Sequence, residues 1–187
     1  MVIPAPWLQT YSGLIYNIMS PNLEHISIID IAHSLSMQCR YNGHTKKFYS
    51  VAEHSCILCD FAINHDYPLS SRKWALMHDA SETYLGDIIR PFKIILNGYQ
   101  VYEDITLTAI AKKFELNLPI PNDIQIIDLL ILNNERKHLL IPNIFDWGIG
   151  EESLSDIKIE CWEPSQAKKE FTDRFIKLFY KDKVDEI

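Results

Sequence analysis

The sequence lacks the features of a membrane or secreted protein. No segment reaches the roughly 18 consecutive apolar residues that span a bilayer, and the first residues, MVIPAPWLQTYSG, lack the basic start and apolar run of a secretory signal. The four cysteines fit a reducing compartment, where they act as small apolar residues. We therefore expect a cytoplasmic protein with no membrane partner.

Positive charge is also scarce. The chain has 18 lysines and arginines against 25 acidic residues, a net charge of -7. Nucleic-acid polymers are bound through many Lys and Arg contacts to phosphate, so such a polymer is not expected as a partner. The motifs GxxxxGK, GxGxxG and GxSxG are missing as well, which removes support for a P-loop enzyme, a dinucleotide-binding fold and a serine hydrolase.

The apolar residues that are present favour one mostly α-helical domain over residues 1–187. A chain of 187 residues with 47% hydrophobic residues fills one core and is short for two. Apolar residues at helical spacing predict helices at about 28–39, 51–64, 72–85, 98–114, 123–140 and 164–181, the last docking on the rest. Short β pieces are expected near 8–16 and 39–50.

Local signals mark several helix ends. Ser50 and Glu53 form a capping box that starts the helix at 51. Gly86 ends the helix at 72–85, and the stretch 87–91 is expected to be an extended turn, because the residue before a proline avoids the helical region. The pair Cys56 and Cys59 lies mid-helix and is interpreted as core filler, not as a metal or redox site.

A set of histidines and aspartates carries the chemistry. His54 shares a helix face with apolar residues, Asp128 falls on the most apolar stripe of the chain, and His78-Asp79 lies inside an apolar helical stretch. Singly, each could be a core residue, a helix cap or the partner of an arginine. Together they favour a metal site, because imidazole and carboxylate suit a divalent ion and buried charges must be paired or ligated.

A local cluster of positive charge precedes His54. Arg40, His44, Lys46 and Lys47 follow one another with no acid among them, which is compatible with a site for a small anion or with a solvated loop.

In order and spacing, these motifs resemble the HD-domain metal-dependent phosphohydrolases. The similarity is to their short 5'-deoxynucleotidase-like branch, which also includes phage deoxynucleoside triphosphohydrolases, and it covers roughly residues 28–140. The residues that carry it are Glu53-His54-Ser55, Met77-His78-Asp79-Ala80-Ser81-Glu82, Gly86-Asp87 with Pro91 and Lys93, and Ile127-Asp128. Tyr41 stands where such nucleotidases carry Trp, and the turn after Asp87 reads Ile-Ile-Arg-Pro instead of Leu-Pro-Thr-Pro.

The resemblance implies an HD-domain helical bundle and a role for each residue. Its metal ligands would be His54, His78, Asp79 and Asp128, holding a divalent ion such as Co, Mn, Zn or Mg. Its catalytic acids would be Glu82, which handles a proton beside the metal, and Asp87. Arg40 would bind phosphate. His44 and Lys47, from the segment between Arg40 and His54, and Lys93 are further candidates for substrate binding.

The implied function is that of a 5'-deoxynucleotidase, which converts a deoxynucleoside monophosphate to the deoxynucleoside and phosphate. We expect a small deoxynucleotide as the ligand and a homo-oligomer, in the host cytoplasm if a phage encodes the chain. One alternative is a triphosphohydrolase acting on a substrate such as dATP, and hydrolysis of cyclic nucleotides or guanosine tetraphosphate is less favoured. A non-catalytic metal- or nucleotide-binding module is a further alternative, against which the spare carboxylate of Glu82 argues.

Overall fold

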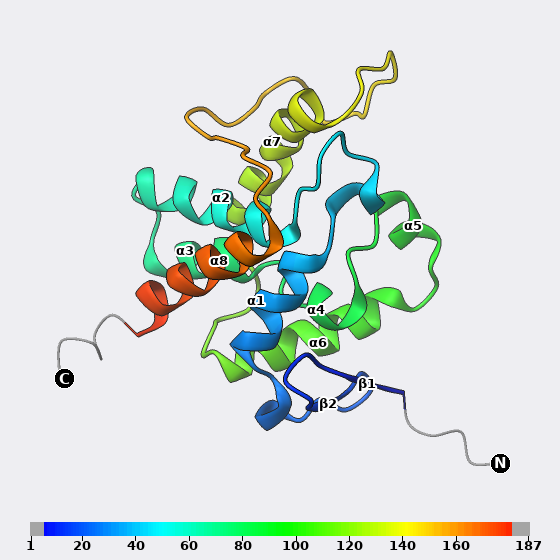
Figure 1. Ribbon diagram of the computed structural model, residues 1–187, viewed down its shortest axis with the longest axis vertical. Coiled ribbons are helices and arrows are strands. Elements are labelled where there is room, and N and C mark those ends of the chain that lie inside the picture. The colour runs from blue at the N-terminus through cyan, green and yellow to red at the C-terminus, as the bar shows by residue number, and fades with distance from the viewer. Residues whose placement is uncertain (1–5, 181–187) are drawn as a thin grey trace.

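The computed structural model describes residues 6–180, and these form a mostly helical fold with one small β-hairpin (Figure 1). In the hairpin, β1 (Trp7–Gln9) pairs antiparallel with β2 (Ile15–Asn17), with Leu8 opposite Tyr16. The helices are α1 (Ile28–Met37), α2 (Val51–Asn64), α3 (Leu69–Met77), α4 (Glu82–Leu85), α5 (Arg90–Ile95), α6 (Tyr99–Lys113), α7 (Asn122–Leu139) and α8 (Pro164–Phe179), with 3-10 turns at Leu23–His25 and Arg40–Gly43.

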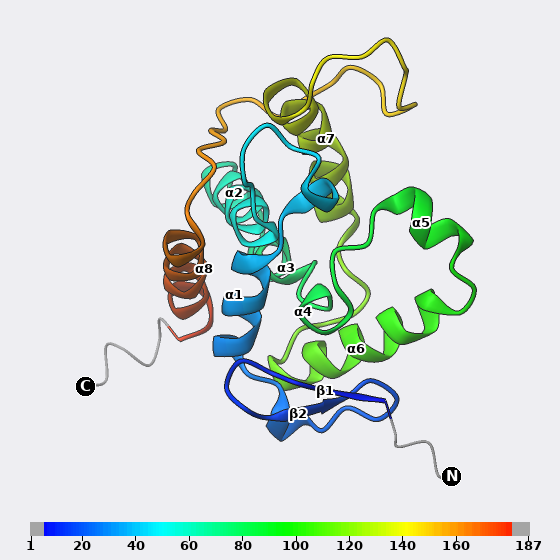
Figure 2. The ribbon, with the colours of Figure 1, turned by 45° about the vertical axis from the view of Figure 1, so that its right-hand side comes forward.

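Helices α1, α2, α3 and α8 pack against one another and enclose much of the core. Helix α7 crosses α2 and α3, while α6 and the hairpin lie at the opposite end of the molecule (Figure 2). The largest fully buried side chains include Trp74, Leu58, Leu35, Phe171 and Phe175. Burying each such side chain stabilises the fold by about 1.5–3 kcal/mol. None of the helices in the described part of the chain is long and apolar enough to cross a membrane.

Helix α8 docks as the sequence predicts. It begins at Pro164, a residue suited to a first helical turn, and buries Ala167, Phe171 and Phe175 in the core. The helix ends at Phe179, and the predicted end at residue 181 lies outside the described residues.

The predicted helix at 72–85 is wrong as a single element, because the chain forms two helices there. Helix α3 starts earlier, at Leu69, and ends at Met77, and α4 runs only from Glu82 to Leu85. Between the two helices the backbone forms hydrogen bonds of the 3-10 type, which join residues three apart. The amide of Ala80 donates to Met77 O and the amide of Glu82 donates to Asp79 O, each at 3.0 Å. The apolar pattern continues through this break, so periodicity alone does not reveal it.

The predicted extended turn at 87–91 is also too long. The backbone is non-helical through Ile89, and Arg90 already begins α5. Pro91 fits there because the first turn of a helix needs no amide hydrogen from it. None of the residues of α5 is buried, so this short helix stands out from the core between Gly86 and Gly98.

The predicted capping box is only half formed. The amide of Glu53 donates to Ser50 Oγ at 3.1 Å, as expected. The Glu53 carboxylate, however, accepts from the amides of Glu160, Cys161 and Trp162 at 2.8, 2.8 and 2.6 Å. The irregular segment at 142–163, for which the sequence predicts no role, is thereby fastened to the first turn of α2.

The pair Cys56 and Cys59 is fully buried in α2, which confirms its interpretation as core filler. Burial raises the pKa of the Cys59 thiol to about 12. The second predicted β region contains a single bridge between Cys39 and Ser50.

Candidate metal centre

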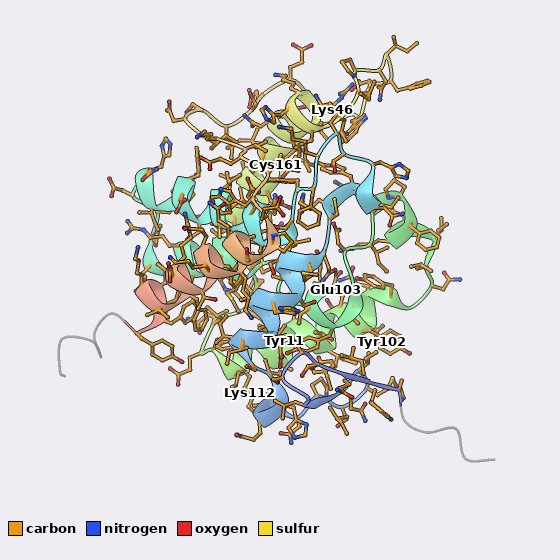
Figure 3. The ribbon with its side chains drawn as sticks, viewed as in Figure 1. Tyr11, Lys46, Tyr102, Glu103, Lys112 and Cys161 are labelled. Atoms are coloured by element: carbon orange, nitrogen blue, oxygen red, sulfur yellow. The ribbon has the colours of Figure 1, made fainter. Side chains whose placement is uncertain are left out.

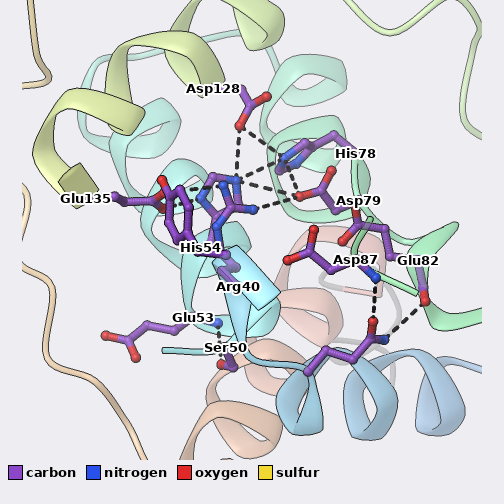
Figure 4. A network of polar contacts seen from close by, with 12 residues as sticks. Arg40, Ser50, Glu53, His54, His78, Asp79, Glu82, Asp87, Asp128 and Glu135 are labelled. Carbon is purple, nitrogen blue, oxygen red and sulfur yellow. Dashed lines mark hydrogen bonds and ion pairs between the residues drawn. The ribbon is translucent and has the colours of Figure 1, made fainter. Parts of the chain in front are cut away.

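Four side chains predicted as metal ligands converge from three segments of the chain. His54 projects from α2, His78 and Asp79 follow α3 directly, and Asp128 lies in α7 (Figure 4). His54 Nε2 lies 3.3 Å from His78 Nε2 and 3.1 Å from Asp128 Oδ1. One ligand atom each from His54, His78 and Asp128 falls within 4.8 Å of the others, a grouping that could hold a metal ion.

Asp79 lies beside this group of three. Its Oδ2 is 3.2 Å from His78 Nε2 and 3.7 Å from His54 Nε2. Metal–ligand bonds of about 2.0–2.2 Å place neighbouring ligand atoms about 3.0–3.6 Å apart, a range that most of these separations match. Asp128 is less buried than predicted: its side chain is 40% exposed, so it lies at the edge of the apolar stripe formed by Ile124 and Ile131.

Both imidazoles turn the same nitrogen toward the centre. His78 Nδ1 lies 3.0 Å from the carbonyl oxygen of Ala75, which can only accept, so a neutral His78 carries its proton on Nδ1 and presents the lone pair of Nε2. His54 Nδ1 similarly lies 2.7 Å from Glu135 Oε1. Two neutral imidazoles would thus point lone pairs at each other across 3.3 Å, an arrangement that a cation between them relieves.

The electrostatics of the centre also favour a cation. Burial opposes charge on His78, yet the neighbouring Asp79 and Asp128 carboxylates raise its pKa well above the usual value. Burial alone would raise the pKa of Asp128, but the two imidazoles lower it well below the ordinary range. Protons and a metal ion would therefore compete for the same positions.

Glu135 is the residue that sequence reasoning missed. Its carboxylate is fully buried in α7 and accepts from Tyr41 Oη at 2.5 Å, Tyr49 Oη at 3.0 Å, His54 Nδ1 at 2.7 Å and Arg40 Nη2 at 3.2 Å. Burial alone would raise its pKa, but Arg40 and His54 hold the pKa to about 2. The sequence contains one indication of its position: Glu135 follows Asp128 by seven residues, and residues seven apart share a helix face.

The two predicted catalytic acids lie next to the centre. Glu82 is buried, and its Oε2 has no hydrogen-bond partner among residues 6–180. Burial raises the pKa of Glu82 well above the usual value, and the nearby carboxylates of Asp79 and Asp87 raise it further. Burial also raises the pKa of Asp87, while its amide donates to the Gln38 side chain at 2.8 Å.

Two predicted substrate-binding cations border the same site. Arg40 is buried, with Nη1 3.4 Å from Asp79 Oδ2, and it does not pair with Asp128. Lys93, from α5, lies 2.9 Å from Glu103 Oε1 and 3.5 Å from Glu82 Oε1. Each cation therefore contacts carboxylates, and a phosphate would have to share it with them.

His44 and Lys47 are the other two residues predicted to bind substrate. Both are exposed on the loop that leads to α2. Burial raises the pKa of the Cys161 thiol, and the positive charge of Lys47 partly offsets that rise. Figure 3 shows Cys161 and Lys46 in the upper part of the view, toward the α7 end of the molecule. Within residues 6–180 no hydrogen bond or ion pair joins the side chains of His44 and Lys47 to the centre, so their role in binding substrate stays a prediction.

A pocket of about 260 Å³ opens beside the centre. It is lined by His78, Asp79 and Asp128 on the metal side and by Ser81, Gln100, Glu103, Asp104, Leu107, Ile120, Ile124 and Gln125 elsewhere. The pocket therefore joins the cluster to α6 and combines apolar, amide and acidic side chains.

Comparison with known proteins finds two bacterial proteins that are similar to this chain, and no family model matches it. Uncharacterized protein YfdR of Escherichia coli is 32% identical over 171 residues, which cover 90% of this chain and 93% of YfdR. Uncharacterized protein RCAP_rcc00048 of Rhodobacter capsulatus is 36% identical over 125 residues, 64% of this chain and 63% of that protein. With nearly its whole length aligned to YfdR, the chain belongs to the same protein family as YfdR.

Proposed function

We propose that this protein is a metal-dependent phosphohydrolase of the HD-domain type and that it removes phosphate from 5'-deoxynucleoside monophosphates. The observation that carries the proposal is the convergence of two Nε2 atoms and two carboxylates, with a buried, unpartnered Glu82 oxygen nearby. A site that only held a metal would need no such carboxylate beside it.

The ligands fit a divalent ion. When bound, such an ion supplies a Lewis acid for the phosphoryl oxygens and lowers the pKa of a bound water toward about 7. His54, His78, Asp79 and Asp128 would hold it, and two nitrogens with two oxygens suit Zn²⁺, Co²⁺ or Mn²⁺ better than a site made of oxygens alone.

The residues around the centre then have distinct tasks. Arg40 lies at its edge and would orient the phosphate through a guanidinium hydrogen-bonding fork. Glu82, whose pKa burial raises, would deliver a proton to the leaving 5' oxygen. The adjoining pocket would receive the nucleoside, since its Gln100 and Gln125 amides and its apolar residues suit a sugar and a base.

The charge of the site favours a monophosphate. Arg40 contacts Asp79 and Glu135, and Lys93 contacts Glu82 and Glu103, so both cations are already neutralised. The pocket lining within residues 6–180 contains neither Lys nor Arg. A monophosphate brings less negative charge toward this acidic lining than a triphosphate does, so the monophosphate is the better fit.

A substrate panel tests the proposal. Purified protein is freed of metal, reloaded with Mn²⁺, Co²⁺, Zn²⁺ or Mg²⁺, and incubated with deoxynucleoside mono- and triphosphates, and the products are separated by chromatography. We expect phosphate and deoxynucleoside from monophosphates only when metal is present. Triphosphate released from dATP, with no activity on dAMP, would favour the triphosphohydrolase instead. Metal binding without turnover of any substrate would favour a binding module.

A further inference from the structure

The buried carboxylate of Glu135 connects two parts of the centre. Its Oε1 accepts from His54 Nδ1 and Tyr49 Oη, and its Oε2 accepts from Arg40 Nη2 and Tyr41 Oη. Both oxygens therefore receive two donors each, and the carboxylate is fully buried. One side chain thus holds a predicted metal ligand with one oxygen and a predicted phosphate ligand with the other.

We propose that Glu135 is a positioning residue: it fixes the tautomer and orientation of His54 for metal binding through Nε2 and fixes the guanidinium of Arg40 beside that metal. The inference rests on the metal centre of the proposed function. An ionised carboxylate can only accept hydrogen bonds, so it requires the proton of a neutral His54 to be on Nδ1. Nε2 then presents its lone pair toward His78 and Asp128.

The geometry explains why a glutamine could not replace Glu135. A Gln side chain has one acceptor oxygen and one donor nitrogen, whereas the site offers donors on both sides. If the amide nitrogen of the Gln faces Arg40, its N–H groups meet the N–H groups of the guanidinium. Both groups are donors, and a guanidinium has no atom that can accept a hydrogen bond. With the nitrogen toward His54, the imidazole can accept only by moving its proton to Nε2, which blocks the lone pair that the metal needs.

The first test measures metal affinity without any substrate. Wild-type protein and Glu135→Gln are titrated with Zn²⁺ against a chromophoric chelator. We expect Glu135→Gln to bind about 10–100 times more weakly, the range found when a partner of a metal-bound histidine is removed. Tyr49→Phe is the matched control, because it removes a donor to the same Oε1 without touching the tautomer of His54. It should keep wild-type affinity within a few-fold.

The second test uses wild-type protein alone, so its result does not depend on whether a variant folds. In zinc-loaded wild-type protein labelled with ¹⁵N at histidine, long-range ¹H–¹⁵N spectra identify which His54 nitrogen carries the proton. The proposal requires a protonated Nδ1 and a metal-bound Nε2. A His54 bound through Nδ1, or equal Zn²⁺ affinity for wild type and Glu135→Gln, would overturn it while leaving the metal centre standing. Failure of wild-type protein to bind any metal would overturn both this inference and the proposed function.

Discussion

Replacing Asp128 by Asn should separate the stability of the fold from the stability added by the metal. The change keeps the size of the side chain and removes the charge that faces the Nε2 atoms of His54 and His78 at 3.1 and 3.7 Å. The side chain is 40% exposed, so we expect its ion pairs to contribute at most about 1 kcal/mol to the metal-free fold. The melting temperature without metal should therefore change little.

We expect a larger effect of metal binding on stability. At a free-ion concentration of 100 times Kd, binding stabilises the folded state by about 2.7 kcal/mol. For a domain of this length, 1 kcal/mol shifts Tm by about 2–4 °C, so loading should raise the wild-type Tm by about 5–11 °C. If losing the carboxylate weakens binding about a hundredfold, the gain at the same ion concentration falls to about 0.4 kcal/mol, or about 1–2 °C.

Differential scanning fluorimetry with EDTA and with added Mn²⁺ or Zn²⁺ measures both quantities. Asp66→Asn is the matched control, because Asp66 is 98% exposed and has a positive φ of 57°, which Asn tolerates. It should retain the full wild-type gain. An Asp128→Asn protein with the same metal-dependent gain as wild type would refute the reasoning.

Two further predictions follow from the surroundings of the centre. Glu82→Gln should keep metal affinity and lose about a hundredfold or more in kcat with a deoxynucleoside monophosphate, because the buried side chain is assigned proton transfer and not metal binding; normal turnover would move that role to Asp87. Cys56 and Cys59 should resist thiol reagents in the folded protein, because burial raises both pKa values. Mass spectrometry of partly labelled protein should find the half-buried Cys39 and Cys161 modified before them, and early labelling of the buried pair would contradict the structure.

Residues whose environment lies on their own helix were predictable. His54 shares a face of α2 with Val51 and Leu58, and it is fully buried as that face requires. The stripe of Phe171 and Phe175 on α8 is buried for the same reason. In these cases the period of 3.6 residues determines which side chains turn inward.

Features that depend on distant segments were not predictable. Glu135 resembles any charged residue of α7 in the sequence, and its burial follows from donors that arrive from Arg40 to His54. The carboxylate of Glu53 likewise meets its partners more than a hundred residues later, at Glu160 to Trp162. Only the tertiary structure shows such pairings, because periodicity indicates at most the helix face on which a residue lies and not the distant groups that it meets.

An anomalous difference map from a crystal of protein loaded with Mn²⁺, Co²⁺ or Zn²⁺ tests the metal centre most directly. The account predicts one strong peak within bonding distance of His54 Nε2, His78 Nε2 and carboxylate oxygens of Asp79 and Asp128, with Glu82 outside the coordination shell. No peak among these side chains at full loading, or a peak elsewhere in the protein, would contradict it.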